Sequence, residues 1–382
     1  MIPYLIPILL AIWGIIHYDV RERTINDKWL YWGIYVYIVL LYGLRYRMGF
    51  DTHIYMDYFY QFPTLENIEE INEPQFDAFA VGFKVLWAVI RSFSDEYWAY
   101  ELITSIFINL ILMRFIWNNT DKKFTVLLLY LICLSWYYNM EITREAYSIC
   151  FFLLGYKYLM ARKWLKYYMF VAAAILFHIS ACILILLPLV VKYPIKFNKT
   201  FLIIVVLLSL LFFSLQAYIP QMIQILGDNI LASKLLHYST QMGVGSINSN
   251  WLISRMAIFC IFPLIYLTLY KYYFKTTVPF ETFIVVMILI SLGIPIFQEI
   301  FVRLTNYFRI LFIISVGTVV GKGISWQSTK KFVSYSLLVI TCTLYIQSRI
   351  ALELKGAMGT YYPYQSIIQW KLNPFEDPGR IY

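Results

Sequence analysis

The stretch TFLIIVVLLSLLFFSLQAYI, residues 200–219, runs for 20 positions without a charged side chain. At about 1.5 Å per residue, a helix of this length spans about 30 Å, the hydrocarbon thickness of a membrane. Apolar runs of this kind recur along the whole chain: 2–17, 29–44, 76–93, 97–116, 124–138, 147–161, 167–191, 200–219, 251–270, 280–297, 304–321 and 332–350. The pattern predicts an all-α polytopic integral membrane protein with about 10–12 transmembrane helices.

The composition supports the same fold class. Hydrophobic residues make up 61% of the chain and charged residues 14%, whereas soluble domains are about a quarter charged. The net charge of +9 could point to nucleic acid. However, the basic residues fall in short loops between apolar runs, and no basic stripe with interleaved aromatic residues is present. We therefore expect membrane lipids, and no nucleic acid, among the partners.

The loop charges predict a topology. Short loops rich in lysine and arginine belong on the cytoplasmic side, and here they contain Arg21/Arg23/Lys28, Lys122/Lys123, Arg162/Lys163/Lys166, Lys192/Lys196/Lys199, Lys271/Lys275 and Lys322/Lys330/Lys331. All of them can be inside only if 76–93 lies at the outer interface and 167–191 is a re-entrant pair of half-helices meeting near His178. The alternative is that one or two loops violate the rule.

With this topology both termini are outside. We expect one transmembrane domain, 1–382, with periplasmic segments 45–75 and 219–250 and a periplasmic tail, 351–382.

Two arginines and an aspartate lie at the membrane boundary in GLRYRMGFD, residues 43–51. Placing an arginine side chain near hydrocarbon costs several kcal/mol unless a partner group or water binds the guanidinium. The planar guanidinium groups of Arg45 and Arg47 suit bidentate binding of pyrophosphate, although snorkelling to lipid headgroups would also account for them. Asp51 could act as a general base or simply cap a helix.

Further charged groups fall on the same predicted side. Arg144 is at the start of a predicted helix, close to Glu141. The two side chains either form a simple ion pair or face the same outer cavity. His178, in FHISA, lies deep in the membrane, where a lone histidine is usually structural. Arg255 opens another helix. Arg303, Asn306 and Tyr307 share one helical face, with Arg309 and Glu299 nearby, and either anchor the interface or face the cavity.

Several catalytic signatures are absent from the sequence. It has no P-loop, GxGxxG or HExxH motif, no Cys/His cluster with zinc spacing, and no D-x-D element. The five cysteines lie in apolar runs without paired spacing, which argues against a disulfide framework. We therefore expect a cationic cleft with no metal and no cofactor.

Three stretches resemble the EpsG/Wzy-type bacterial polysaccharide polymerases: GLRYRMGFDTHIYMDYF, EITREAYSICFFLLGYKYLMARKWLKYY and LFHISACILILLPL. The resemblance covers most of the chain. The residues that fit the family elements are Arg45, Gly49, Asp51, Tyr55, Arg144, His178, Ser180, Arg303 and Tyr307. The chain departs at Thr52, where tyrosine is usual, and around Arg144, where Met140, Glu141 and Glu145 replace the common asparagine and glutamine.

The resemblance implies a GT-C-like membrane enzyme of the bacterial inner membrane. Such an enzyme transfers a growing glycan from undecaprenyl pyrophosphate to a hydroxyl of an incoming lipid-linked repeat unit, at the periplasmic face. A chain-length regulator and export machinery are implied partners. The expected pyrophosphate ligands are Arg45, Arg47, Arg144, Arg255, Arg303, Tyr307 and Ser180, and the candidate bases are Asp51, His178 and Glu141.

Three other functions share some of these features. An oligosaccharide ligase would deliver the glycan to a different acceptor. A membrane O-acyltransferase would use a buried base such as His178, but would have less need of the arginines. A flippase for lipid-linked oligosaccharide would also need a cationic cavity, and the absence of evident inverted repeats counts against it.

Overall fold

The computed structural model describes residues 2–21, 26–49, 52–215, 218, 249–323, 328–353 and 364–372. Helices account for nearly all of these residues, and no strand occurs among them. The chain is thus an all-α polytopic membrane protein, as predicted. Asp51 and most of the expected segments 219–250 and 351–382 lie outside the described residues.

Four helices in the described part are long and apolar enough to cross a membrane. They span Ile2–Asp19 (α1 and η1), Tyr97–Asn119 (α5), Leu252–Tyr273 (α14, η7, α15 and η8) and Gln298–Gly323 (α17). A fifth span would be the pair Lys123–Met140 and Thr143–Met160 (α8), which is bent by 119°.

Most of the other apolar runs form shorter helices. These are Asp27–Gly43 (α2), Trp164–Phe177 (α9), Ile179–Leu186 (η5), Leu187–Lys192 (α10), Lys199–Leu215 (α11) and Glu281–Ser291 (α16). The helix Ser328–Glu353 (α18) contains the apolar stretch Lys331–Thr343. Among the described residues, four or five helices are therefore long spans, and most of the remaining apolar runs form shorter helices. Hydropathy marks which residues avoid water, but not where the backbone turns inside an apolar run.

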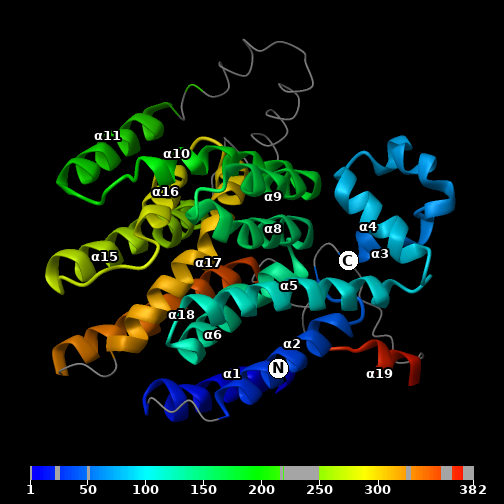
Figure 1. Ribbon diagram of the computed structural model, residues 1–382, viewed down its shortest axis with the longest axis horizontal. Coiled ribbons are helices and arrows are strands. Elements are labelled where there is room, and N and C mark those ends of the chain that lie inside the picture. Colours follow the sequence, from blue (N-terminus) through cyan, green and yellow to red (C-terminus); the bar gives the residue numbers. More distant parts are fainter. Residues whose placement is uncertain are drawn as a thin grey trace.

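Helix α17 forms the centre of the bundle (Figure 1) and is almost entirely buried. It packs against α16, α18 and Lys123–Tyr130 (α6). Two glycines allow the close approach to α6, because a Cβ atom at Gly317 would lie 2.7 Å from Val126 and one at Gly321 would lie 2.6 Å from Lys122. Small residues are the usual means by which membrane helices approach closely.

Several loops predicted to be basic meet at one end of the molecule, which we call the basic end. The Asp19 carboxylate accepts hydrogen bonds from the backbone N–H and the hydroxyl of Thr125, both at 2.7 Å. Lys122 donates to the Asp19 carbonyl at 2.7 Å, and Lys123 pairs with Asp27 at 3.0 Å. The loops near residues 20 and 122 therefore lie together, as the charge pattern requires.

The opposite end carries a small helical layer, which we call the cap. It consists of Thr52–Gln61 (α3), Leu65–Asn72 (η2), Pro74–Phe76 (η3) and Val81–Arg91 (α4) (Figure 1). Its aromatic side chains form a hydrophobic cluster separate from the main core, centred on the fully buried Trp87. The run 76–93 thus contains the 11-residue α4, which is too short to span a membrane.

The C-terminal part of the described chain also lies at the cap end. The Tyr46 N–H donates to the Gln365 carbonyl at 3.0 Å, and the Ile367 N–H donates to the Leu44 carbonyl at 2.8 Å. The helix that follows, Ile367–Leu372 (α19), lies beside this bridge. The segment that begins at residue 45 and the described part of the C-terminal segment therefore share one end, and the side of the membrane on which they lie stays a prediction.

Candidate functional site

The backbone turns sharply at His178, at the cap end of α9. Helix α9 ends at Phe177, His178 is extended (φ −155°, ψ 126°), and η5 begins at the next residue. The Tyr167 hydroxyl donates to the Leu184 carbonyl at 2.8 Å, so the chain after His178 folds back along α9. Two short helices therefore meet at His178, and that they form a re-entrant membrane segment stays a prediction.

A chain of hydrogen bonds runs through this turn and joins α17, η5, α8 and α9. Its links are Arg303 Nη1 to His178 Nε2 (3.2 Å), His178 Nδ1 to Ser180 Oγ (2.5 Å), Ser180 Oγ to Tyr307 Oη (2.9 Å), Tyr307 Oη to Ser148 Oγ (2.9 Å) and Ser148 Oγ to the Ala174 carbonyl (2.9 Å).

The two ends of this series of hydrogen bonds determine which atoms carry the protons. A guanidinium can only donate, so His178 Nε2 must accept, and a neutral imidazole then carries its proton on Nδ1. At the other end a carbonyl can only accept, so Ser148 must donate to Ala174 and receive from Tyr307. Both ends require His178 Nδ1 to donate to Ser180, and the arginine end also requires the imidazole to be neutral. The longer approach of the Ser180 N–H to Nδ1, 3.3 Å, is then a contact and not a hydrogen bond.

A second buried network lies next to the first on α17. Asn306 Nδ2 donates to the Glu145 carboxylate at 2.9 Å, and Arg309 Nη1 donates to Asn306 Oδ1 at 2.9 Å. The guanidinium of Arg309 lies over the Tyr137 and Phe259 rings, 4.9 and 5.1 Å from their centres. Glu145 and Arg309 are both buried. The amide of Asn306 thus bridges a carboxylate and an arginine that are far apart in the sequence.

Arginines from three separate segments converge around these networks. Arg144 donates to the Ala78 carbonyl of the cap at 2.7 Å, and Arg144 and Arg303 are both charged neighbours of His178. Arg255, which is partly buried, has Arg309, Glu299 and Glu141 as charged neighbours. The structure therefore brings together the predicted Arg144, Arg303, His178, Ser180 and Tyr307. The predicted Arg255 and Glu141 are neighbours of each other, beside Arg309 of the second network.

Arg45 has a different environment from the one expected. Its Nη2 pairs with the Glu101 carboxylate at 3.1 Å, and the two side chains are 3% and 1% exposed. Its other nitrogens donate to the carbonyls of Met48 at 3.0 Å and Tyr42 at 2.7 Å. Expected as a pyrophosphate ligand, Arg45 instead holds the end of α2 to α5. The guanidinium of Arg47 lies over the Tyr46 ring, 5.4 Å from its centre.

Some members of the site could not be singled out from the sequence. Ser148 looks like an ordinary small residue, although its place four residues after Arg144 puts it on the same helical face. Tyr137 is one of 34 tyrosines, and nothing local distinguishes it. Within the described residues, no group of three or more His, Cys, Asp or Glu side chains converges in a way that could hold a metal ion.

Comparison with known proteins gives one match. The model of the EpsG family matches residues 28–366, which include both networks and the cap and end one residue before Ile367 of the bridge to the C-terminal segment. Neither a curated protein nor a solved structure matches the chain. Since the family model covers most of the sequence, the chain belongs to the EpsG family.

Proposed function

We propose that this protein is a polysaccharide polymerase that transfers a growing glycan from undecaprenyl pyrophosphate to a hydroxyl of an incoming lipid-linked repeat unit. Membership of the EpsG family supports a polysaccharide polymerase-type membrane protein with glycosyltransferase-like chemistry. The observation that supports the finer proposal is the clustering of arginines at the cap end: Arg144 and Arg303 lie near His178, and Arg303 and Arg309 lie near Glu145. Arg255 is a neighbour of Arg309. We assign this end to the periplasmic face of the bacterial inner membrane, with the loops of the basic end in the cytoplasm.

In this proposal Arg144 and Arg303 bind the pyrophosphate leaving group. Negative charge develops on its bridging oxygen as the glycosidic bond breaks, and donors that are fixed beforehand stabilise that charge with little reorganisation. A guanidinium has five N–H donors, and the bond from Arg303 to His178 uses one of them. No step requires a metal ion, because the arginines supply the positive charge.

His178 is better suited to position Arg303 than to act as the base. Its unprotonated nitrogen, Nε2, accepts the hydrogen bond from Arg303, and its Nδ1 proton is directed to Ser180. Proton abstraction from the acceptor hydroxyl would require the Arg303 bond to break. We therefore assign the base to Asp51 or Glu141, and we assign Ser180 and Tyr307 to holding His178.

The test is polymerisation in vitro. The purified chain is incubated with an authentic lipid-linked repeat unit, with and without EDTA, and the products are separated by size. A ladder of products that is unaffected by EDTA is expected. Transfer of a single repeat to another acceptor would indicate a ligase, and no product or a strict need for metal would overturn the proposal.

Variants of single arginines, measured in the same assay, test whether Arg144 and Arg303 belong to the active site. Arg303→Lys and Arg144→Lys keep the charge but remove the planar fork, so both should shorten or abolish the ladder. Arg21→Lys, an exposed arginine at the basic end, should leave the ladder unchanged. Equal ladders from all three variants would show that bidentate arginine binding is not required.

A further inference from the structure

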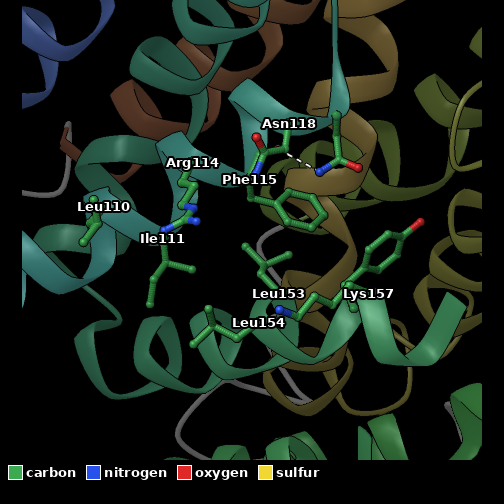
Figure 2. Close-up of a pocket in the computed structure, with 10 residues that line it drawn as sticks. Leu110, Ile111, Arg114, Phe115, Asn118, Leu153, Leu154 and Lys157 are labelled. Carbon is green, nitrogen blue, oxygen red and sulfur yellow. Dashed lines mark hydrogen bonds between the residues drawn. The ribbon is translucent and has the colours of Figure 1, made fainter. Parts of the chain in front are cut away.

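A cavity of about 570 Å³ lies between α5 and α8, in the half of each helix nearer the basic end (Figure 2). Helix α5 begins among the cap aromatics at Tyr97 and Tyr100 and ends at Asn119, beside the basic loop. Helix α8 begins at the Arg144 site and ends at Met160. The cavity is lined by Leu110, Ile111, Arg114, Phe115, Asn118, Asn119, Leu153, Leu154, Tyr156 and Lys157. It is therefore separate from the site around His178.

The polar lining of this cavity is cationic. Arg114 comes from the α5 wall and Lys157 from the α8 wall (Figure 2), and no lining residue is acidic. Within the described part of the chain, Arg114 makes no hydrogen bond or ion pair. Asn118 and Asn119 add amide groups at the end of α5, where Asn119 donates to the Phe115 carbonyl at 2.8 Å. The positive charge of the cavity lining therefore favours an anionic ligand.

The remaining lining is apolar and open to the membrane. In Figure 2, Leu153 lies between the α5 and α8 walls, with Ile111 beside Arg114 and Leu154 beside Lys157. The rim residues Leu110 and Leu154 are 40% and 36% exposed. Arg114 lies five residues before the end of α5, about 7.5 Å along the helix, and Lys157 three before the end of α8, about 4.5 Å. A molecule with a phosphate at this depth and a hydrocarbon chain beyond it fits both parts of the cavity.

We propose that this cavity binds an anionic glycerophospholipid of the surrounding membrane, with the phosphate between Arg114 and Lys157 and an acyl chain over Ile111, Leu153 and Leu154. Basic pockets between membrane helices are known to hold anionic headgroups. Arg114 and Lys157 are exposed, as snorkelling side chains would be, but they line opposite walls of one cavity between two helices. Lys157 Nζ lies 4.9 Å from the centre of the Tyr158 ring, at the edge of the cavity. The inference does not depend on the proposed function, because it concerns different residues at the other end of the molecule.

Native mass spectrometry of the full chain tests the proposal. The protein is released from micelles that contain equal amounts of phosphatidylglycerol and phosphatidylcholine, and the retained lipids are counted. One phosphatidylglycerol per chain is expected for the wild type. The Arg114→Gln, Lys157→Gln double variant should bind it about 30-fold more weakly, since each cation contributes about a factor of five.

Two further variants make the result decisive. Lys163→Gln with Lys166→Gln removes two exposed cations just outside the cavity and should retain phosphatidylglycerol as the wild type does. Leu153→Trp keeps both cations but fills the apolar part, and should lose the lipid. If the double variant does not fold, lipid retention by Leu153→Trp tests the proposal in its place.

Three results would overturn the proposal. These are equal retention of phosphatidylcholine, retention of phosphatidylglycerol by the Arg114→Gln, Lys157→Gln variant at the level of its control, and displacement of phosphatidylglycerol by added undecaprenyl phosphate. The last would mean that the occupant is a polyprenyl carrier and not a membrane phospholipid.

Discussion

Arg45 and Arg303 both come from motifs at the cap end, yet their surroundings differ in one chemical respect. Arg45 is 3% exposed and pairs with the Glu101 carboxylate. Arg303 is partly exposed and donates to a neutral imidazole, which is held in turn by Ser180 and Tyr307. A carboxylate neutralises the arginine that it binds, whereas a neutral histidine can orient an arginine without neutralising it. Arg303 also has Glu145 as a charged neighbour. The first arrangement stabilises a fold and the second suits an anionic ligand.

The largest expected effect is on stability, from breaking the Arg45 pair. Arg45→Met or Glu101→Gln leaves one buried group without its partner, which costs about 3–5 kcal/mol. The double variant Arg45→Met, Glu101→Met should recover most of this loss, since both charges are then gone. Denaturant unfolding in detergent, followed as a double-mutant cycle, measures both effects. If Arg45→Met unfolds like the wild type but makes no polymer, Arg45 is a ligand and the comparison fails.

The next effect is on catalysis, from changing Arg303. Arg303→Lys should lower kcat by about 10²–10³-fold, the usual loss when one fixed donor to a developing anion is removed. Its unfolding free energy should change far less than that of Arg45→Met. Initial rates of ladder formation are compared with those of Arg21→Lys. A stability loss equal to that of Arg45→Met would show that Arg303 is structural as well.

A smaller effect should follow from loosening the support of His178. Tyr307→Phe removes the hydroxyl that joins Ser180 to Ser148, so Arg303 is held less firmly. Turnover should fall about 3–10-fold, the equivalent of one hydrogen bond, with little change in KM. Tyr266→Phe is the matched control, because this buried tyrosine also bonds a serine, Ser315, at 2.8 Å. An equal loss of turnover in both variants would argue against a positioning role.

The smallest effect concerns an exposed ion pair of the same chemical kind as Arg45 and Glu101. Lys322 and Asp121 approach to 3.5 Å with side chains 50% and 59% exposed. Lys322→Gln should cost at most about 1 kcal/mol, and the difference from the wild type should shrink in high salt. Unfolding at two salt concentrations checks this. A loss as large as that of Arg45→Met would mean that burial is not what distinguishes the two pairs.

The sequence predicted some of the site for reasons that are local. Arg303 and Tyr307 lie four residues apart, so any helix through them presents both on one face. The turn at His178 followed from the loop charges, because a full span there would put a basic loop on the wrong side. Glu101 could not be found in this way. It lies inside the apolar run 97–116, and its partner Arg45 is 56 positions earlier in the chain.

By itself, the sequence determined that this is an all-α membrane protein, that its basic loops gather at one end, and that arginines collect at the other. These features depend on hydropathy and on charge at membrane boundaries, which act over about one helix length. Only the tertiary structure decided which arginine meets a carboxylate, which meets a histidine, and where two helices leave a cavity. Those outcomes depend on how helices distant in the sequence pack, and the same residue type has opposite roles according to its neighbour.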